Sequence, residues 1–363
     1  MYVKELFLDN FRNLQKQRIE FCEGINIIYG LNAQGKSNLL ESIRILSMGR
    51  SFRGSRTSEL IRFGEDYFYV RIFIKLQEGD KRIEFGYRSN GNKVIKVNGN
   101  KIKSISDLLG HLLTVIFSPE DLNIIKEGPS YRRKYLDSCI SVIDKNYLYN
   151  LMQYNKVLVN RNKLLKDIKE DRSKKSLLEI FDEQLIGYGS KIIVMRQNYL
   201  KNMESYMKSF LREISNEKVE IIYINSVGLK EAFEEAIIKK RLKERLEKNL
   251  DLDLKFLTTQ TGPHREDFKI IINGYDSRIY SSQGQQRTGA LCLKLSEFEI
   301  LKKETGEKPI LLLDDVMSEL DENRKKYILR KLEGFQTFIT HTTKKDLIGD
   351  CYFNIFSGIV TKE

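Results

Sequence analysis

The chain is 363 residues long, which is enough for two domains or for one large domain that carries an insertion. Hydrophobic residues make up 41% and charged residues 31%, a composition that excludes a disordered or fibrous protein. Lys and Arg outnumber Asp and Glu by 62 to 50, a net charge of +12. This excess fits a polyanionic partner such as nucleic acid, or a lysine-rich surface that only confers solubility.

Targeting signals and metal-binding cysteine patterns are not found in the sequence. No apolar run approaches the roughly 20 residues that span a bilayer. The segment Met1–Glu5 lacks the basic and then apolar pattern of a signal peptide, so we expect a cytoplasmic protein. The cysteines at positions 22, 139, 292 and 351 lie far apart and form no CxxC pair. We therefore expect buried free thiols and no zinc site.

The N-terminal part of the chain is predicted to be rich in strands. Val3–Phe11 alternates between apolar and polar residues, and Ile25–Tyr29 is a short apolar run that ends at a glycine. Apolar residues recur at helical spacing after Ser37 and predict a helix there. Two further strands are expected at residues 67–75 and 81–88, followed by a hairpin at 94–101 around an Asn-Gly turn.

The character of the chain changes to charged helix from about Asp144. Apolar residues on alternating three- and four-residue steps between Tyr147 and Ile168, interrupted by Arg161, predict an amphipathic helix that packs on a neighbour. Residues 169–175 form a polar break, and further helices are predicted at 178–213 and 229–249. Strands return at Phe268–Ile272 and, after Asn273-Gly274, at Arg278–Tyr280. Two strand-rich flanks therefore enclose a helical middle of roughly 120 residues.

A phosphate-binding loop follows the apolar run at residues 25–29. The segment from Gly30 to Ser37 fits the pattern G-x-x-x-x-G-K-[ST] and lies between a predicted strand and a predicted helix. Its backbone N–H groups would surround the phosphates of ATP, Lys36 would reach the β- and γ-phosphates, and Ser37 would bind Mg²⁺. The nucleotide-binding residues expected here are Gly30, Leu31, Asn32, Ala33, Gln34, Gly35, Lys36 and Ser37.

A second apolar run, Ile310–Leu313, ends in two acidic residues and supplies the expected Walker B motif. Asp314 would hold Mg²⁺, and Asp315 stands where a catalytic base or a water-positioning residue belongs. Ser37 and Asp314 must meet at one nucleotide although 277 residues separate them. The two flanks are thus predicted to form one α/β ATPase domain, residues 1–125 and 251–363, with an inserted helical arm at 126–250.

A glycine-containing turn before another predicted helix offers a second anion-binding device. Ser282-Gln283-Gly284-Gln285 resembles the signature motif of ABC-type ATPase heads, in which two heads enclose two ATP molecules. Ser318–Asp321 is similar to the D-loop of those heads, and Thr340-His341 falls where a switch histidine is expected. The resemblance implies that Ser282, Gln283, Gly284 and Gln285 complete the nucleotide site of a second subunit, and that Lys36, Asp315 and His341 are catalytic.

Within that superfamily the chain resembles the RecF family of bacterial recombination mediators. The similarity is carried by five segments in order, at residues 8–13, 118–122, 131–137, 262–265 and 282–288. It implies an SMC/Rad50-like head with a short helical arm, ATP-dependent homodimerisation, slow ATP hydrolysis and binding to single-stranded, double-stranded or gapped DNA. It also implies work with RecO and RecR in DNA replication and repair, where RecA is loaded at gaps.

The sequence departs from the usual ABC pattern at three places. The second Walker B acid is Asp315 where a glutamate is usual, and its shorter side chain fits slow hydrolysis. The segment Phe117–Leu122 replaces a recognisable glutamine loop. Relatives often carry only threonines at the switch position, so Thr340, Thr342 and Thr343 compete with His341 for that role.

Several polar residues allow two interpretations. Arg12 and Asn13 follow the first strand, and they contact nucleotide or form a surface turn. His264 and Arg265 contact nucleotide or DNA, or else form a buried hydrogen-bonded pair. The run Arg132, Arg133 and Lys134 binds DNA or is a solvated charged face.

Two other protein classes share some of these features. A nucleotide-binding subunit of a membrane transporter also carries these motifs, but the long insertion and the missing glutamine loop argue against it. An SMC-like tether would need heptads sustained over many turns, and the helical middle is too short for that.

Overall fold

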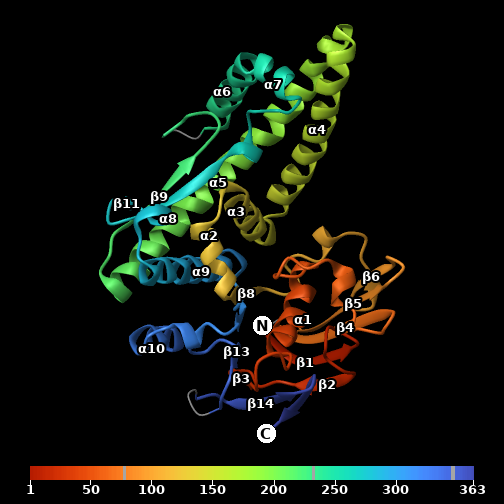
Figure 1. Cartoon of the computed structure of the whole chain (residues 1–363), viewed down its shortest axis with the longest axis vertical. Coiled ribbons are helices and arrows are strands. Elements are labelled where there is room, and N and C mark those ends of the chain that lie inside the picture. Colours follow the sequence, from red (N-terminus) through yellow and green to blue (C-terminus); the bar gives the residue numbers. More distant parts are fainter. Residues whose placement is uncertain (77–78, 231–233, 345–347) are drawn as a thin grey trace. The chain divides into compact units, whose positions relative to one another are not determined.

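The computed structural model of the chain describes residues 1–76, 79–230, 234–344 and 348–363 (Figure 1). It divides into two compact units. The first, here called the head unit, comprises Met1–Asp121 and Glu297–Glu363, and the second, the arm unit, comprises Leu122–Ser296. The arm unit is therefore an insertion between two sequence-distant parts of one head, which is the organisation predicted from the two nucleotide-binding motifs.

A six-stranded sheet carries the nucleotide-binding motifs in the head unit. Its strand order is β15-β14-β3-β13-β12-β8, and all neighbours are parallel except the β14–β15 pair. The central strands are short apolar runs that are buried on both faces, as parallel strands usually are. The bounds are β3 Ile25–Tyr29, β8 Thr114–Phe117, β12 Ile310–Leu313, β13 Thr337–His341, β14 Cys351–Phe356 and β15 Ile359–Lys362.

A second, antiparallel sheet of the head unit has the order β2-β1-β4-β5-β6-β7. Its apolar face joins helix α1 (Lys36–Met48) and the first sheet in one continuous core, which includes Ile43 of α1, Ile72 and Phe338. The bounds are β1 Tyr2–Asp9, β2 Gln17–Glu20, β4 Tyr67–Leu76, β5 Gly79–Arg88, β6 Lys93–Val97 and β7 Asn100–Lys101. The core thus fixes the helix that begins with the phosphate-loop lysine.

Two long helices, α4 (Lys145–Glu170) and α5 (Leu178–Ser215), lie side by side in the arm unit (Figure 1). A three-stranded sheet of order β11-β10-β9 accompanies them, and β9 packs on α5. The strands are β9 Val219–Ile224, β10 Asp267–Ile272 and β11 Tyr275–Asp276. The remaining α-helices of the described chain are α2 Leu122–Lys126, α3 Pro129–Ile143, α6 Glu235–Lys248, α7 Leu250–Phe256, α8 Ser277–Tyr280, α9 Gln283–Thr305 and α10 Glu322–Lys331.

The short 3₁₀ helices connect these elements. They are η1 Thr57–Leu60, η2 Ile105–Asp107, η3 Pro119–Asp121, η4 Arg172–Leu177, η5 Pro263–Arg265 and η6 Met317–Glu319. The polar break predicted at residues 169–175 corresponds to the end of α4 and the start of η4. The α4–α5 connection is therefore a helix–helix turn, as its composition indicates.

Most predicted elements are confirmed, and three need correction. The helical middle contains a strand, β9, which was not predicted although five of its six residues (Val-Glu-Ile-Ile-Tyr-Ile) are aliphatic or aromatic. Arg278–Tyr280 is helical, since the Asp276 side chain accepts a hydrogen bond from the Arg278 N–H at 3.0 Å and starts α8. The helix predicted at 229–249 begins at Glu235, and residues 231–233 lie outside the described part of the chain.

The boundaries of the two units also differ from the predicted domain limits at residues 125 and 250. Residues 251–296 belong to the arm unit, because β10 pairs along its length with β9 and α7 packs on α4. The signature segment therefore starts within the arm unit, while the Walker B strand lies in the head unit.

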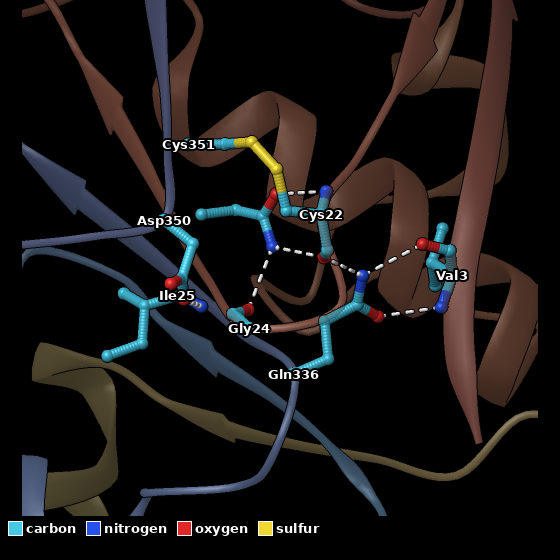
Figure 2. Close-up of a disulfide and its surroundings, with 8 residues drawn as sticks. Val3, Cys22, Gly24, Ile25, Gln336, Asp350 and Cys351 are labelled. Atoms are coloured by element: carbon cyan, nitrogen blue, oxygen red, sulfur yellow. Dashed lines mark hydrogen bonds between the residues drawn. A yellow bond between two sulfur atoms is a disulfide. The ribbon is translucent and has the colours of Figure 1, made fainter.

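The expectation of four free thiols is wrong for one pair of cysteines. Cys22 and Cys351 form a disulfide, with their Cα atoms 6.1 Å apart (Figure 2). Cys139 and Cys292 are buried and are not part of that disulfide. Sequence spacing could not reveal the pair, since β14 is brought beside β3 only by the sheet order. The disulfide joins the start of β14 to the loop before β3.

The Gln336 side chain fastens that same loop (Figure 2). Its amide donates to the carbonyls of Val3, at 2.8 Å, and Cys22, at 2.7 Å, and its oxygen accepts the Val3 N–H.

Among the described residues, no helix is long and apolar enough to cross a membrane.

Candidate nucleotide-binding site

The phosphate loop occupies the connection between β3 and α1, at the carboxyl edge of the parallel sheet. Gly30 has φ +153° and Gly35 has φ +120°, so both need a residue without a Cβ. A Cβ on Gly30 would lie 2.4 Å from the Ile355 carbonyl oxygen, and one on Gly35 would lie 2.8 Å from the Asn13 Oδ1. Leu31, Asn32 and Ala33 form the exposed crest of the loop, as expected of backbone that is to meet a ligand.

Lys36 lies in the first turn of α1, and its ammonium group contacts the phosphate loop. Its Nζ donates to the carbonyl oxygens of Gly30, at 2.7 Å, and Leu31, at 3.0 Å. Burial lowers the pKa of Lys36, while the nearby carboxylates of Asp315 and Asp314 raise it. An ammonium group with these neighbours lies where the terminal phosphates of a nucleotide are bound in loops of this kind.

Asp314 lies at the end of β12 and connects the two flanks of the sequence. Its Oδ1 accepts hydrogen bonds from the hydroxyls of Ser37, at 2.8 Å, and Thr340, at 2.9 Å. Burial raises the pKa of this carboxyl, and the two hydroxyl donors lower it. One carboxylate and one hydroxyl, together with phosphate oxygens, are a donor set that Mg²⁺ accepts, because this ion takes oxygen ligands and needs few from protein. The structure thus brings Ser37 and Asp314 together as predicted.

Asp315 follows with an exposed side chain and a left-handed backbone, φ +53°. Its N–H donates to the Thr340 Oγ1 at 2.8 Å, and the Ser318 hydroxyl donates to its carboxylate at 3.1 Å. A non-glycine residue in this region costs free energy, which is typical of a residue held for a function. The backbone thus directs the second acid away from the first.

Thr340, one of the candidates for the switch position, contacts both acids at the end of β12, a role that the sequence did not reveal. β13 pairs in parallel with β12, with Ile339 opposite Leu313, so Thr340 comes level with Asp314. His341 ends β13, and its Nδ1 contacts the backbone N–H of Thr343 at 3.2 Å. The run of hydroxyl residues around His341 was a signal for this site, but only the strand register shows which hydroxyl reaches the acids.

Arg12 and Asn13 lie against the phosphate loop and α1. The Arg12 guanidinium forms a two-bond ion pair with Glu41 of α1, at 2.9 and 3.1 Å, and the Glu41 side chain is fully buried. Asn13 Nδ2 donates to the Gln34 carbonyl at 2.9 Å, and its Oδ1 accepts from Asn38 at 2.8 Å. Both residues therefore brace the loop and its helix. The role of Glu41 was invisible in sequence, where it is one acid in an amphipathic helix.

The signature segment begins α9 in the arm unit. Ser282 and Gln283 are exposed, and Gly284 lies in the first turn of α9. Ser282 and Gln285 cap the helix reciprocally: the Gln285 N–H donates to the Ser282 Oγ at 3.3 Å, and the Ser282 N–H donates to the Gln285 Oε1 at 2.9 Å. The exposed start of this 23-residue helix carries a partial positive charge that suits an anion.

The candidate DNA-binding run on α3 divides by burial. Arg132 is 5% exposed and forms a bidentate ion pair with Asp267, both contacts 2.7 Å, so its charge is used inside the arm unit. Arg133 is half-buried and donates to the Glu266 carbonyl at 2.7 Å, whereas Lys134 is exposed. The expectation of DNA contact is therefore contradicted for Arg132 by its buried partner.

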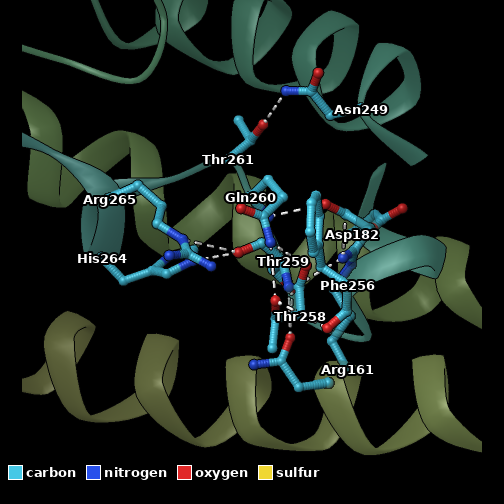
Figure 3. Close-up of polar contacts among 12 residues, drawn as sticks. Arg161, Asp182, Asn249, Phe256, Thr258, Thr259, Gln260, Thr261, His264 and Arg265 are labelled. Atoms are coloured by element: carbon cyan, nitrogen blue, oxygen red, sulfur yellow. Dashed lines mark hydrogen bonds and ion pairs between the residues drawn. The ribbon is translucent and has the colours of Figure 1, made fainter. Parts of the chain in front are cut away.

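His264 belongs to a buried polar network of the arm unit (Figure 3). Its Nε2 lies 2.9 Å from the Thr259 carbonyl and its Nδ1 lies 2.7 Å from the Tyr154 hydroxyl. Since a carbonyl only accepts, Nε2 carries the proton and Nδ1 accepts from Tyr154. Arg265 donates to the same Thr259 carbonyl at 3.2 Å. The two side chains share the Thr259 carbonyl as acceptor, but Arg265 is exposed, so the buried hydrogen-bonded interpretation fits His264 better than Arg265.

Comparison with known proteins agrees with these features. The model of the RecF/RecN/SMC N-terminal domain family matches residues 2–362. A protein named DNA replication and repair protein RecF, from Thermoanaerobacter sp. (strain X514), is 80% identical over 363 residues, all of both chains. The chain belongs to the RecF family. The RecF of Caldanaerobacter subterraneus subsp. tengcongensis is 70% identical over 364 residues and also matches along its whole length.

Solved structures show the same fold. A structure described as the recombination mediator protein RecF with ATP in the RecFOR pathway superimposes with a TM-score of 0.97, at 70% identity, and covers 100% of this chain and 97% of that one. The Smc head domain of Pyrococcus furiosus matches with a TM-score of 0.58 at 16% identity over 100% of this chain and 96% of the other, a likeness of fold alone. The predicted α/β SMC-like head with an inserted arm is confirmed.

Proposed function

We propose that this RecF-family chain is an ATP-dependent, DNA-binding recombination mediator that acts as a homodimer. The observation that carries the proposal is the junction of Lys36, Ser37 and Asp314 at one sheet edge, supported by the ATP-bound RecF that resembles this chain at 70% identity. ATP is bound along Gly30–Ser37, with Arg12 and Asn13 holding the loop from the side. Ser37 and Asp314 would hold Mg²⁺, which would supply positive charge next to the phosphates.

Hydrolysis is proposed to be slow and to serve release. Asp315 positions or deprotonates the attacking water, Lys36 stabilises phosphate charge, and His341 acts as the switch residue after β13. Because the Asp315 side chain is short and exposed, few protein groups would contact the attacking water. In this proposal the ATP-bound form of the protein carries the function, and hydrolysis only ends it.

Dimerisation is proposed to complete the site. Ser282, Gln283, Gly284 and Gln285 of one subunit meet the γ-phosphate held by the other, since the exposed N-terminus of α9 offers N–H donors to an anion. ATP then joins two heads reversibly, and the joined heads clamp DNA. RecO and RecR are the proposed protein partners, because similar RecF structures are described within a RecFOR pathway. RecA loading at gapped DNA is the proposed outcome.

DNA binding is proposed mainly for the arm unit. Between Leu122 and Ser296 the sequence holds 32 Lys and Arg against 23 Asp and Glu, so nine of the twelve net positive charges lie there. Lys134 on α3 is exposed, and Arg133 borders it, whereas Arg132 is no longer a candidate. Lys and Arg side chains of such a surface would neutralise DNA phosphates and release the counterions condensed on the DNA, which makes binding depend on salt.

One experiment tests these parts together. Size analysis with and without ATP and Mg²⁺ should show a monomer that becomes a dimer with ATP, and Lys36→Ala should remain monomeric. Adding duplex or gapped DNA should increase the apparent size of the ATP-bound dimer. The affinity for DNA should fall at least tenfold between 50 and 200 mM salt if the site contacts several phosphates. A Lys36→Ala profile equal to that of the parent chain would refute the phosphate-loop assignment. Salt-independent DNA binding would refute the charge argument.

A further inference from the structure

A carboxylate at the end of the long arm helix contacts the signature segment. Glu217 lies two residues after Ser215, the last residue of α5. Its Oε1 accepts a hydrogen bond from the Gln285 Nε2 at 2.7 Å. Both residues belong to the arm unit, although 68 positions separate them in sequence. The contact is charge-assisted and short, which makes it one of the stronger side-chain hydrogen bonds available to a neutral donor.

The charge of Glu217 fixes the orientation of the Gln285 amide. A carboxylate accepts only, so it must face the NH₂ end of that amide. The amide oxygen then points to the Ser282 N–H, which it accepts at 2.9 Å, and the Ser282 Oγ accepts the Gln285 N–H in turn. Without the carboxylate, the two ends of the amide could exchange places, and an NH₂ group facing the Ser282 N–H would break the capping box.

Glu217 is itself held by two neighbouring elements. The Ser215 hydroxyl donates to its Oε2 at 2.8 Å, and Asn216 ends α5 in the left-handed conformation with φ +54°. Asn273, in the turn between β10 and β11, donates to the Glu217 Oε1 at 3.3 Å and accepts the Lys218 N–H at 3.0 Å. The carboxylate therefore has one position, set by the helix end and the turn.

We infer that Glu217 is a positioning residue that holds the signature turn, through Gln285, in the form that receives the nucleotide of a second subunit. The inference rests on the proposed role of Ser282 to Gln285 in the dimer. Glu217 is not among the residues proposed to bind nucleotide or metal. Because α5 spans 38 residues of the arm, the contact also gives the arm a direct connection to the segment that closes the dimer.

The test compares Glu217→Ala with Glu220→Ala. Glu220 lines the same surface hollow and is exposed on β9, so its removal takes away the same charge without touching Gln285. In the nucleotide-free chain, hydrogen exchange of the amides at 282–286 should be roughly tenfold faster in Glu217→Ala than in Glu220→Ala. The ATP-dependent dimer should also be roughly tenfold weaker in Glu217→Ala, with ATP affinity of the monomer unchanged.

A charge exchange separates the specific contact from general destabilisation. Gln285→Glu alone places two carboxylates together and should speed exchange at 282–286, while Glu217→Gln with Gln285→Glu restores a donor facing an acceptor and should slow it again. Exchange in Glu217→Ala equal to that in Glu220→Ala, or no recovery in the double variant, overturns the inference. If the parent chain stays monomeric with ATP while exchange responds as expected, the dimer proposal fails and the positioning role of Glu217 stands.

Discussion

A single hydroxyl group, that of Thr340, connects the two acidic residues at the end of β12. It donates to the Asp314 carboxylate and accepts the Asp315 N–H. The first bond keeps the pKa of Asp314 from rising further in its buried position, and the second fixes the backbone that turns Asp315 outward. Thr340 thus links the acid proposed to bind metal with the acid proposed to be catalytic.

Thr340→Val should lower ATP hydrolysis about tenfold, because it leaves the Asp315 N–H without its acceptor and removes one donor from Asp314. The side chain keeps its shape, so the fold and the melting temperature should change little. Steady-state hydrolysis is the measurement, with Thr361→Val, an exposed threonine on β15, as the matched control. Equal rates in the two variants would remove Thr340 from the site.

His264 contributes to stability through its neutral form. Burial lowers its pKa to about 4, well below the value of about 6.5 in an unfolded chain. Between these values the unfolded state binds more protons than the folded state, so the stabilisation is complete above about pH 6.5 and is lost as the pH falls toward 4. A second proton, on Nδ1, would also displace the hydrogen bond from Tyr154.

His264→Gln should therefore flatten the pH dependence of unfolding. From pH 7.5 to pH 5 the parent chain should lose about 2 kcal/mol more than the variant in its free energy of unfolding. Urea denaturation followed by circular dichroism at the two pH values measures this difference. Parallel losses in parent and variant would show that His264 titrates as an exposed histidine.

At the residue scale, the sequence predicted those site residues that stand in a local motif. Lys36, Ser37 and Asp314 stand in motifs whose spacing is fixed by the loop or by the end of a strand, and the structure brings them together. Thr340 and Glu41 act through partners 26 and 29 positions away, and such contacts depend on strand register and helix rotation. Arg132 was predicted as a DNA contact because a run of charges does not reveal which member is buried.

At the element scale, buried Arg161 ties together four segments of the arm. Its guanidinium contacts Asp182 of α5 at 2.5 Å, Asp253 of α7 at 2.6 Å and the Thr259 hydroxyl at 2.9 Å (Figure 3). Arg161 and Asp253 are fully buried. In sequence, Arg161 interrupts the apolar stripe of α4, and the interruption marks the place where α4 meets charged partners.

Arg161→Met should destabilise the arm unit by about 3–5 kcal/mol, because it leaves buried carboxylates without their cation. Lys163→Met, exposed on the same helix, should change stability by less than about 0.5 kcal/mol. The midpoint of urea denaturation measures both. A loss for Arg161→Met no larger than for Lys163→Met would mean that the ion pairs are offset by the cost of burying them.

Element types were predicted well where periodicity is strong, as along α4 and α5, and poorly where short elements depend on partners. β9 is a mostly apolar run of only six residues between two charged helices, and such a short run does not distinguish strand from helix until its pairing with β10 is known. Arg278–Tyr280 has strand-like residues, yet the Asp276 cap starts a helix there. The hydrogen bond of the Asp276 cap and the pairing of β9 with β10 thus decide conformations that the sequence pattern alone did not predict.

At the scale of the whole molecule, the head and arm were predicted as a split domain with an insertion because one nucleotide needs both motifs. The second boundary was misplaced by about 46 residues, since β10 and α7 read as a return to the head but pack within the arm. The pairing of Cys22 with Cys351 was likewise beyond prediction, because only the sheet order brings residues 329 positions apart together.

The place of β3 in its sheet has a consequence for protein synthesis. β3 lies between β13 and β14, so both of its neighbours come from the last part of the chain to be made. At roughly 5–20 residues per second, β3 leaves the ribosome some 15 to 60 s before β13. During that interval its apolar residues have no sheet partner and are available to chaperones or to aggregation. A nascent chain therefore has no ATP site until synthesis has passed residue 341, and the arm is complete before the head.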